Sequence, residues 1–384
     1  MNKIKIFILF SFVFFLLTNI QPIQSQPGTR EEIMIPDIPG YKTLKCDFHI
    51  HTMFSDGQVW PDTRVEEAWE EGLDAIAITD HIEWRPHKED VSADLNRPYE
   101  IAQSTAEQYD ILLIQGAEIT RKMPPGHLNA IFLKDVNPLN TDKWEDALQL
   151  AKDQGAYIFW NHPGWTGQQP DGIARWYDEH TMLLEKKMIN GIEIINYREY
   201  YEIVHQWCVD KKITILANSD IHSPTRMFYE KSGPNRRPIT LVFAKERTLG
   251  AIKETLFAGR TATLWKNELI GNEEFLKPIF DQSIWIKNQE IILKGKQTSH
   301  IQIFNHSEID FELVLKTAPE KIEVPKEITL YGGKTVRLRI KSKDDSQQGK
   351  QEIAIPYTIT NLKTEPAKGL PIELKLNFVF EPAK

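Results

Sequence analysis

The pattern of apolar and polar positions divides the chain into two regions of different character. Between residues 44 and 263, short apolar runs alternate with segments whose apolar side chains recur at helical spacing. Seven strand-like runs end at Ile50, Thr79, Ala117, Leu133, Trp160, Asn196 and Asn218. Helical patterns between them cover 62–71, 99–109, 141–154 and 200–211. Apolar strands separated by helices are typical of a buried, mostly parallel sheet, and seven of them fit a closed or nearly closed β/α barrel better than an open sheet.

After about residue 267 the helical spacing gives way to short alternating runs. Six such runs, separated by turn residues, lie at 283–293, 299–305, 311–315, 335–340, 352–360 and 372–380. Short strands at this spacing predict a small antiparallel all-β sandwich. We therefore expect a lead-in at 26–43, an α/β barrel domain at 44–266 and an accessory sandwich domain at 267–384.

Residues 1–25 have the layout of a leader sequence. Lys3 and Lys5 precede an apolar run at 6–17, and a more polar stretch then ends in Ser25. This arrangement is typical of a secretory signal peptide, and the apolar run is short for a membrane span; a retained membrane anchor is the alternative. We expect cleavage near Ser25, export to the periplasm or the outside of the cell, and no stable membrane insertion afterwards.

Net charge and cysteine content narrow the class of protein further. The chain carries a net charge of −8, which becomes about −10 when the two leader lysines are removed. An acidic chain argues against binding to long nucleic acid, which requires a basic face. Cys46 lies on a predicted strand and Cys208 on a predicted helix, and nothing in the pattern indicates that they meet, so both are predicted to be buried thiols.

Candidate chemistry gathers where the predicted strands end. His49 and His51 lie two residues apart on the first strand, so their imidazoles project to the same side, and Asp56 follows in a turn. Two histidines beside a carboxylate are a starting point for a divalent-metal site. Six of the eleven histidines and three carboxylates lie at strand edges, mostly the C-terminal ones: His49, His51, Asp56, His81, Glu118, His127, His162, Asp220 and His222.

Each of these residues alone would be read as an ordinary loop or core residue with a hydrogen bond. Barrel enzymes, however, assemble their sites at the C-terminal rim of the strands, and clustered histidines and carboxylates there indicate metal binding. Asp80 and Asn161 are expected to orient neighbouring ligands.

The motifs HxHTxxSDG, TDH, GxE, a lone mid-chain histidine, NHP and SDxH occur in that order. The ordered set resembles the PHP (polymerase and histidinol phosphatase) family of metal-dependent phosphoesterases, over about residues 44–263. The resemblance implies a distorted (β/α)7 barrel with two or three divalent ions, Zn, Mn or Fe, in its mouth. Asp56 stands where some members of the family have a histidine, and every other ligand position of the family pattern is filled.

Position by position, the resemblance also implies a ligand set for each ion. The first ion would be held by His49, His51, Glu118 and Asp220. Glu118 would bridge to the second ion, whose further ligands would be His127 and His162. The third ion would be held by Asp56, His81 and His222. The same nine residues are thereby expected to carry catalysis.

Charge indicates the kind of substrate. Six neutral imidazoles and three carboxylates around three dications leave a surplus of about three positive charges, which would attract an anion such as a phosphate ester. Adjacent metals can generate hydroxide near neutral pH and stabilise the attacking and leaving oxygens. We therefore expect an enzyme that hydrolyses small phosphate mono- or diesters with a metal-bound hydroxide. The sequence contains no GxSxG motif of serine hydrolases and no glycine-rich nucleotide-binding loop.

Two other functions stay open, and a few residues are candidates for substrate binding. One alternative is a metal-dependent hydrolase of carbonyl bonds, and the other is a non-catalytic secreted binding protein with structural metals. Arg121, Arg198 and Arg226 follow predicted rim residues and could hold a phosphate in a bidentate manner, or could be solvated loop arginines. Trp165 could stack on a ring of the substrate or merely cover the barrel.

Overall fold

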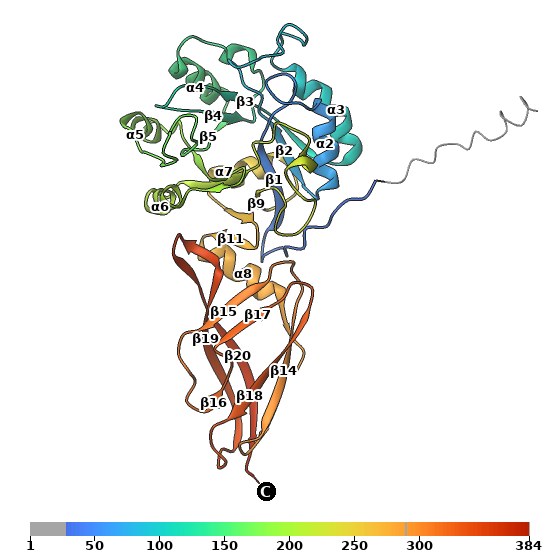
Figure 1. Cartoon of the computed structure of the whole chain (residues 1–384), viewed down its shortest axis with the longest axis vertical. Helices are drawn as coiled ribbons and strands as arrows, with labels where there is room; N and C mark the ends of the chain where they lie inside the picture. Colours follow the sequence, from blue (N-terminus) through green and yellow to red (C-terminus); the bar gives the residue numbers. More distant parts are fainter. Residues whose placement is uncertain (1–27, 289, 384) are drawn as a thin grey trace, which may run out of the picture. The chain divides into compact units, whose positions relative to one another are not determined.

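The computed structural model describes residues 28–288 and 290–383 (Figure 1). The predicted signal peptide at 1–25 lies outside the described residues. Within the described part of the chain, none of the helices combines the length and apolarity needed to cross a membrane. Cys46 and Cys208 are both buried free thiols, as predicted.

The first region contains all seven predicted strands. They are β1 (Lys42–Ile50), β2 (Ala75–Ile78), β3 (Leu112–Ile119), β4 (Leu128–Ile131), β5 (Tyr157–Trp160), β6 (Gly191–Asn196) and β8 (Thr214–Asn218). The helices between them are α2 (Pro61–Glu70), α3 (Arg97–Tyr109), α4 (Trp144–Asp153), α5 (Asp178–Glu185) and α6 (Glu202–Lys211). The four helical patterns predicted α2, α3, α4 and α6, whereas α5 was not singled out.

The sheet of this region is mixed, with parallel pairs in the majority among the seven strands. Parallel ladders join β1 to β2, β2 to β3, β5 to β6 and β6 to β8. Strand β4 runs antiparallel to both β3 and β5. On the far side of β1, the unpredicted strand β9 (Ile239–Ala244) and then β10 (Thr261–Trp265) add antiparallel pairs. The reversal of β4 brings its first residue, not its last, to the rim where β3 and β5 end.

Threonine side chains close the ring of strands between β8 and its neighbours. In the described structure β8 forms a backbone ladder only with β6. Thr240 of β9 instead joins Ala217 of β8, accepting a hydrogen bond from its N–H at 2.9 Å and donating to its carbonyl at 2.8 Å. Thr261 of β10 donates to the carbonyl of Ile215 at 2.8 Å. These side-chain bonds complete a distorted barrel.

The interior of the barrel is filled by apolar side chains from most of its strands. One buried cluster combines residues of β1, β2, β3, β4, β5, β8 and β9 with Ile252 and Leu256 of α7 (Leu249–Phe257). Phe48, Phe159 and Val242 in this cluster have no exposed surface. Packing of this kind leaves the strand ends as the place for polar chemistry.

The region from residue 268 onward is mainly β-structure. It begins with β11 (Glu268–Gly271) and one helix that the sequence analysis did not predict, α8 (Glu273–Ser283). The strands that follow are β12 (Ile284–Ile286), β13 (Ile291–Lys294), β14 (Thr298–Asn305), β15 (Phe311–Leu315), β16 (Ile322–Glu323), β17 (Glu327–Leu330), β18 (Thr335–Ser342), β19 (Gly349–Glu365) and β20 (Lys368–Glu381). Strands β12, β14, β18 and β16 form one sheet, and β13, β20, β19, β15 and β17 pair in the other.

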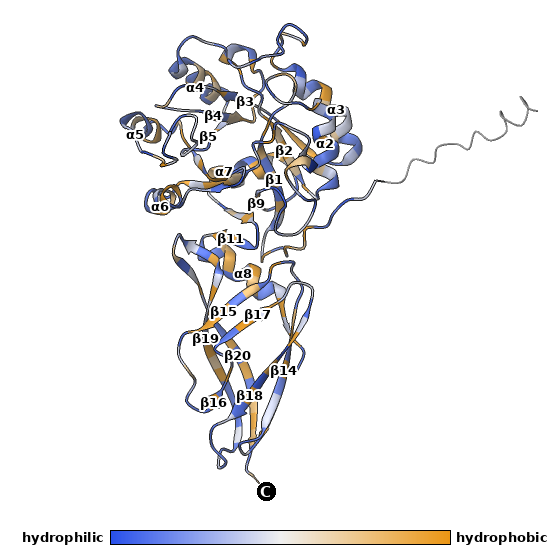
Figure 2. Cartoon of the chain, viewed as in Figure 1, coloured by the Kyte–Doolittle hydropathy of each residue, from blue (hydrophilic) through white to orange (hydrophobic). Residues whose placement is uncertain are grey.

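The two regions differ in how their strands are buried. All four residues of β2 are buried, whereas buried and exposed residues alternate along β14 and β20. Figure 2 shows the same alternation of hydrophobic and hydrophilic residues along strands such as β18 and β20. Alternation is expected where one face of a strand packs in a sandwich and the other meets water. Strand β11 pairs both with β10 and with β19, so the domain boundary near residue 267 stays a prediction.

Candidate metal centre

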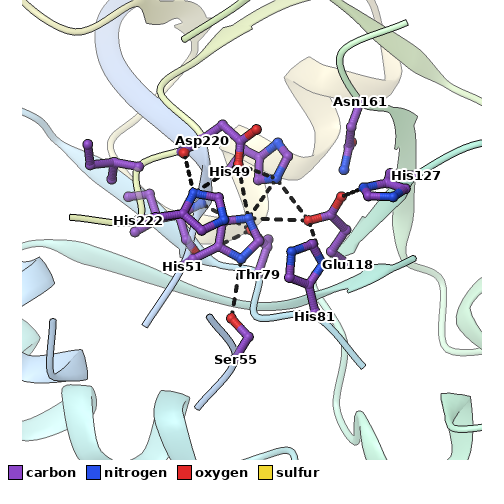
Figure 3. A network of polar contacts seen from close by, with 12 residues as sticks. His49, His51, Ser55, Thr79, His81, Glu118, His127, Asn161, Asp220 and His222 are labelled. Atoms are coloured by element: carbon purple, nitrogen blue, oxygen red, sulfur yellow. Dashed lines mark hydrogen bonds and ion pairs between the residues drawn. The ribbon is translucent and has the colours of Figure 1, made fainter. Parts of the chain in front are cut away.

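The structure brings the nine predicted metal ligands together at one rim of the barrel; all of them except Asp56 and His162 are labelled in Figure 3. Most of them end or follow the strands: His49 on β1, His51 directly after β1, His81 after β2, Glu118 on β3, His162 after β5, and Asp220 and His222 after β8. His127 directly precedes β4, and it reaches the same rim because β4 is antiparallel to its neighbours. Asp56 lies in the turn after β1.

Two backbone bridges set the spacing of these strand ends. Ile50 of β1 pairs with Ile221 in a parallel bridge, and His81 pairs with Glu118 in another. The first bridge sets the end of β1 beside the loop that carries Asp220. Ligands far apart in the sequence therefore become neighbours through the main chain, before any side chain is considered.

The centre of the cluster consists of two imidazoles and two carboxylates. The Nε2 atoms of His49 and His51 lie 3.0 Å apart. Glu118 Oε2 lies 3.1 Å from the first and 3.2 Å from the second, and Asp220 Oδ1 lies 3.2 and 3.0 Å from them (Figure 3). Four donor atoms thus point at one small space.

Glu118 also faces a second set of donors with its other oxygen. Its Oε1 lies 2.7 Å from His127 Nδ1 and 3.6 Å from His162 Nε2. His162 Nε2 is in turn 3.9 Å from Asp220 Oδ2. The two carboxylate oxygens of Glu118 therefore face different groups of histidines, as a bridging ligand would.

A third group lies around Asp56. Its Oδ1 is 3.1 Å from His222 Nε2, 3.5 Å from His81 Nε2 and 3.9 Å from His51 Nδ1. The donor atoms also group in a way that the family resemblance did not imply: His127 groups with His81 and Glu118, and His162 groups with His49 and Glu118.

The burial and bonding of these side chains fit bound cations. His49, His51 and Glu118 are at most 1% exposed. Asp56 Oδ1, Glu118 Oε1 and His127 Nδ1 are buried without a hydrogen bond; the 2.7 Å approach of the last two lacks hydrogen-bond geometry. An unsatisfied buried polar atom costs about 1–3 kcal/mol, so donors crowded in this way suit divalent metal ions.

The pKa values of several residues in the cluster are shifted because buried imidazoles and carboxylates lie so close together. Burial by itself lowers the pKa of His51, but hydrogen bonds to Asp220 and Glu118 outweigh it and raise the pKa to about 9. Burial would raise the pKa of Asp56, yet the imidazole of His222, 3.1 Å away, and those of His51 and His81 lower it to about 2. Burial dominates at His81 and lowers its pKa to about 3. Carboxylates that stay ionised beside imidazoles give the site a strong attraction for positive charge.

A buried glutamate, which the sequence analysis did not single out, orients two of the histidines. Glu193 Oε1 accepts a hydrogen bond from His49 Nδ1 at 2.8 Å, and Oε2 accepts one from the backbone N–H of His162 at 2.7 Å. With Nδ1 donating, the Nε2 lone pair of His49 is directed into the cluster. Glu193 has no exposed surface and interrupts the otherwise apolar run of β6. A charged residue in a buried strand was the signal that could have identified it.

Arg64 of α2 is a second residue that the sequence analysis did not single out. Its guanidinium is buried and donates to the backbone carbonyls of His51 at 2.9 Å and His222 at 2.8 Å. It also bonds the carbonyls of Ile221 at 3.2 Å and Ser223 at 2.9 Å. One side chain therefore ties the end of β1 to the loop after β8.

Asp80 and Asn161, which were expected to orient neighbouring ligands, make buried hydrogen bonds. Asp80 accepts from the N–H of Thr52 at 2.7 Å and from the hydroxyl of Ser55 at 2.6 Å. Asn161 exchanges hydrogen bonds with Asn129, the second residue of β4. These contacts hold the turn before Asp56 and the start of β4.

The four predicted substrate-binding residues have different surroundings. Arg121 pairs with Glu83 at 2.9 Å and donates to the carbonyl of Thr141 at 2.7 Å, so its guanidinium is already engaged. Trp165 is 44% exposed, and its ring centroid lies 5.3 Å from that of His162 and 5.6 Å from that of His127. It therefore forms a wall beside the cluster. Arg198 and Arg226 lie together in a separate groove.

Comparison with known proteins agrees with this architecture. Residues 47–160 match the PHP domain family, and residues 284–375 match the DUF5001 family of Ig-like domains. An uncharacterized protein of Methanocaldococcus jannaschii is 39% identical over 84 residues, which cover 21% of this chain and 36% of that protein. The chain thus spans just over a third of the length of this curated relative.

A solved structure extends the similarity to nearly the whole chain. It is a two-domain protein from Bacteroides vulgatus that contains a predicted PHP-like metal-dependent phosphoesterase. The two share 43% sequence identity with a TM-score of 0.84, over 92% of this chain and 100% of that chain. Since the similarity covers the whole of that protein, the chain belongs to the PHP-like family, as a member in which a PHP domain is followed by an Ig-like domain.

Proposed function

We propose that this protein hydrolyses small phosphate mono- or diesters at the rim cluster, with two to three divalent ions of Zn, Mn or Fe. The observation that carries the proposal is the convergence of nine imidazole and carboxylate side chains, with Glu118 facing two groups of donors through its two oxygens. When bound, the ions would supply Lewis-acid activation of water and positive charge for the phosphate oxygens.

The side chains of the protein have distinct tasks in this proposal. His49 is held by Glu193 so that one nitrogen always points into the site. Asp220 and Glu118 supply negative charge that balances the ions, and the remaining surplus would favour an anionic ester. Trp165 limits the space beside His127 and His162 and so would contact the leaving group.

The test is hydrolysis of three chromogenic esters by the metal-loaded protein: 4-nitrophenyl phosphate, bis(4-nitrophenyl) phosphate and 4-nitrophenyl acetate. We expect cleavage of at least one phosphate ester, loss of activity on chelation, and recovery on adding back metal. Cleavage of the acetate alone would favour a carbonyl hydrolase. Stoichiometric metal with no cleavage of any ester would favour a binding protein whose metals are structural.

We also propose that the protein is exported, and the layout of residues 1–25 supports this proposal. Export predicts a mature N-terminus near residue 26 and protein outside the cytoplasm. N-terminal sequencing of protein from fractionated cells tests it, and an intact N-terminus on cytoplasmic protein would contradict it.

A further inference from the structure

A groove of about 510 Å³ lies beside the loop that carries Asp220 and His222, and none of the nine metal-ligand candidates lines it. We call it the arginine groove. Three segments form it: Arg198 after β6, residues 226–230 and 234–236, and the end of β10, where Trp265 is the last strand residue and Lys266 follows it.

The lining of the arginine groove is strongly basic. Arg198, Arg226, Arg236 and Lys266 line it, against a single carboxylate, that of Glu230. Arg226 is exposed and has neither a hydrogen bond nor an ion pair from its guanidinium to any described residue. Lys266 has no carboxylate partner among the described residues, and its ammonium lies 3.9 Å from the centroid of the Trp265 ring. Positive charge that the protein itself leaves unpaired attracts an anion.

Two arginines of the groove are held in place by the fold. The guanidinium of Arg198 lies 5.4, 5.9 and 5.9 Å from the ring centroids of Tyr197, Phe228 and Tyr229. Arg236 is 4% exposed; it pairs with Glu308, and its Nε is buried without a hydrogen-bond partner. The aromatic rings therefore hold Arg198 at the groove, whereas the guanidinium of Arg236 is engaged by Glu308, so the unpaired positive charge of the groove is that of Arg226 and Lys266.

The groove and the metal centre share one stretch of chain. The hydroxyl of Tyr229 donates to the carbonyl of Tyr197 at 3.0 Å and lies 3.5 Å from that of Ser219, the residue before Asp220. The backbone N–H of Tyr197 also donates to the carbonyl of Asn218, at 3.1 Å. Arg226 follows His222 by four residues, so their Cα atoms are at most about 14 Å apart.

We propose that the arginine groove binds a second phosphate of the substrate, carried on the leaving group. The preferred substrates would then be bisphosphorylated small molecules, with the reacting ester at the metals and the other phosphate at Arg226 and Lys266. This inference rests on the proposed phosphoesterase function, because it assigns a specificity to that same site.

The test uses alkanediol bisphosphates of increasing chain length and the matching monophosphates, with the metal-loaded full chain. At the best length, we expect kcat/KM for the bisphosphate to exceed that for the monophosphate by about tenfold or more, as one charge-assisted contact would give. Arg226→Ala and Lys266→Ala should each reduce this preference, and Arg226→Lys should retain part of it. Arg337→Ala removes a positive charge from an exposed position on β18 and should leave the preference unchanged.

Two outcomes separate this proposal from the proposed function. If monophosphates are cleaved but no bisphosphate is preferred at any length, the groove proposal fails and the phosphoesterase stands. If no phosphate ester is cleaved, binding of alkane bisphosphonates measured by calorimetry still tests the groove. Affinity that is equal in the wild type and Arg226→Ala would overturn the proposal. Activation of the enzyme by inorganic phosphate that depends on Arg226 would also overturn the proposal, because the groove would then bind a free anion and not a phosphate of the substrate.

Discussion

At the scale of single residues, Glu118 is the group that connects the donor sets. Its two oxygens face His49 and His51 on one side and His127 and His162 on the other. It is 1% exposed, and burial opposes its ionised form, yet the surrounding imidazoles keep its pKa well below the ordinary value. A carboxylate kept ionised in so buried a place is suited to bridging two cations.

Metal content should therefore depend on Glu118 more than on a carboxylate outside the cluster. The purified protein should hold two to three equivalents of divalent metal by elemental analysis, and Glu118→Ala should lose more than one. Glu83→Ala, which removes the partner of Arg121, should lose none and serves as the control. A single equivalent that persists in Glu118→Ala would rule out a multinuclear site.

Metal uptake should also release protons. In the metal-free protein the pKa of His51 is about 9, so this imidazole is protonated at pH 7. A metal needs the neutral imidazole, so binding must displace the proton, and metal affinity should rise as the pH rises toward 9. The stability of the metal-free fold should change with pH in the opposite direction to metal affinity. The stabilisation that protonated His51 contributes is complete below about pH 6.5 and is lost as the pH rises through 9. Titration of metal into weakly buffered protein at pH 7 measures the release, and a constant pH would contradict it.

Arg64 should act as a positioning residue for the metal centre. Lysine has one ammonium and no planar fork, so Arg64→Lys would lose several of the hydrogen bonds that Arg64 makes to four backbone carbonyls. The carbonyls of Ile221 and His222 would keep backbone N–H donors. Those of His51 and Ser223 are buried and depend on Arg64, and leaving either one unpaired would cost about 1–3 kcal/mol. We expect the variant to have a lower melting temperature and a weaker affinity for metal than the wild type. Arg97→Lys changes an exposed pair with Glu100 and should alter neither quantity. Loss of stability with unchanged metal affinity would indicate a purely structural role.

At the scale of elements, the rim is assembled by strands that run in different directions. β3 and β5 deliver Glu118 and His162 at or after their C-terminal ends, while β4 delivers His127 at its N-terminal end. The turn after β5 carries Trp165, whose backbone N–H bonds the carbonyl of His162 at 2.9 Å. A ligand and the wall beside it are thus parts of one tight turn.

Shortening that wall should change substrate size selectivity. Trp165→Ala should raise kcat/KM for bulky phosphate esters relative to small ones, because it opens space beside His127 and His162. His162→Ala should abolish turnover of every ester, since it removes a metal-ligand candidate. A series of phosphate esters with leaving groups of increasing size makes the comparison. An unchanged order of preference in Trp165→Ala would show that the tryptophan does not contact the leaving group.

At the scale of the whole molecule, the net charge and the site have opposite effects on anions. The full chain carries a net charge of −8, whereas a metal-loaded rim and the arginine groove are positive. The field of an acidic protein repels a long polyanion more than a small phosphate, which meets mainly the local charge of the site.

Long nucleic acid should accordingly be a poor substrate beside a small organic phosphate. Raising the ionic strength should narrow the difference, because salt screens the overall field over about 8–10 Å. Parallel assays of single-stranded oligonucleotides of increasing length and of a nitrophenyl phosphate test this. Faster cleavage of the longest strand would show that the surface charge does not govern access.

Local patterns in the sequence determined much of this protein. Strands buried on both faces read as apolar runs, so the seven strands β1 to β6 and β8 and four of the helices between them were predictable. The nine metal-ligand candidates were found because short motifs hold them at the ends of those strands. The all-β character of the C-terminal region followed from alternation along strands such as β14 and β20.

Only the tertiary structure decided how these parts meet. An apolar run does not indicate the direction in which its strand lies in the sheet. The reversal of β4 and the closure of the ring through Thr240 were therefore not predictable. Glu193 and Arg64 lie in segments without a metal-binding motif, and the metal-ligand candidates that they hold are more than ten residues away in sequence. The arginine groove likewise combines residues 198, 226 and 266, which no local spacing relates. Motifs specify chemistry over a few residues, whereas register and sheet closure, which depend on the packing of the whole barrel, determine which of those residues become neighbours.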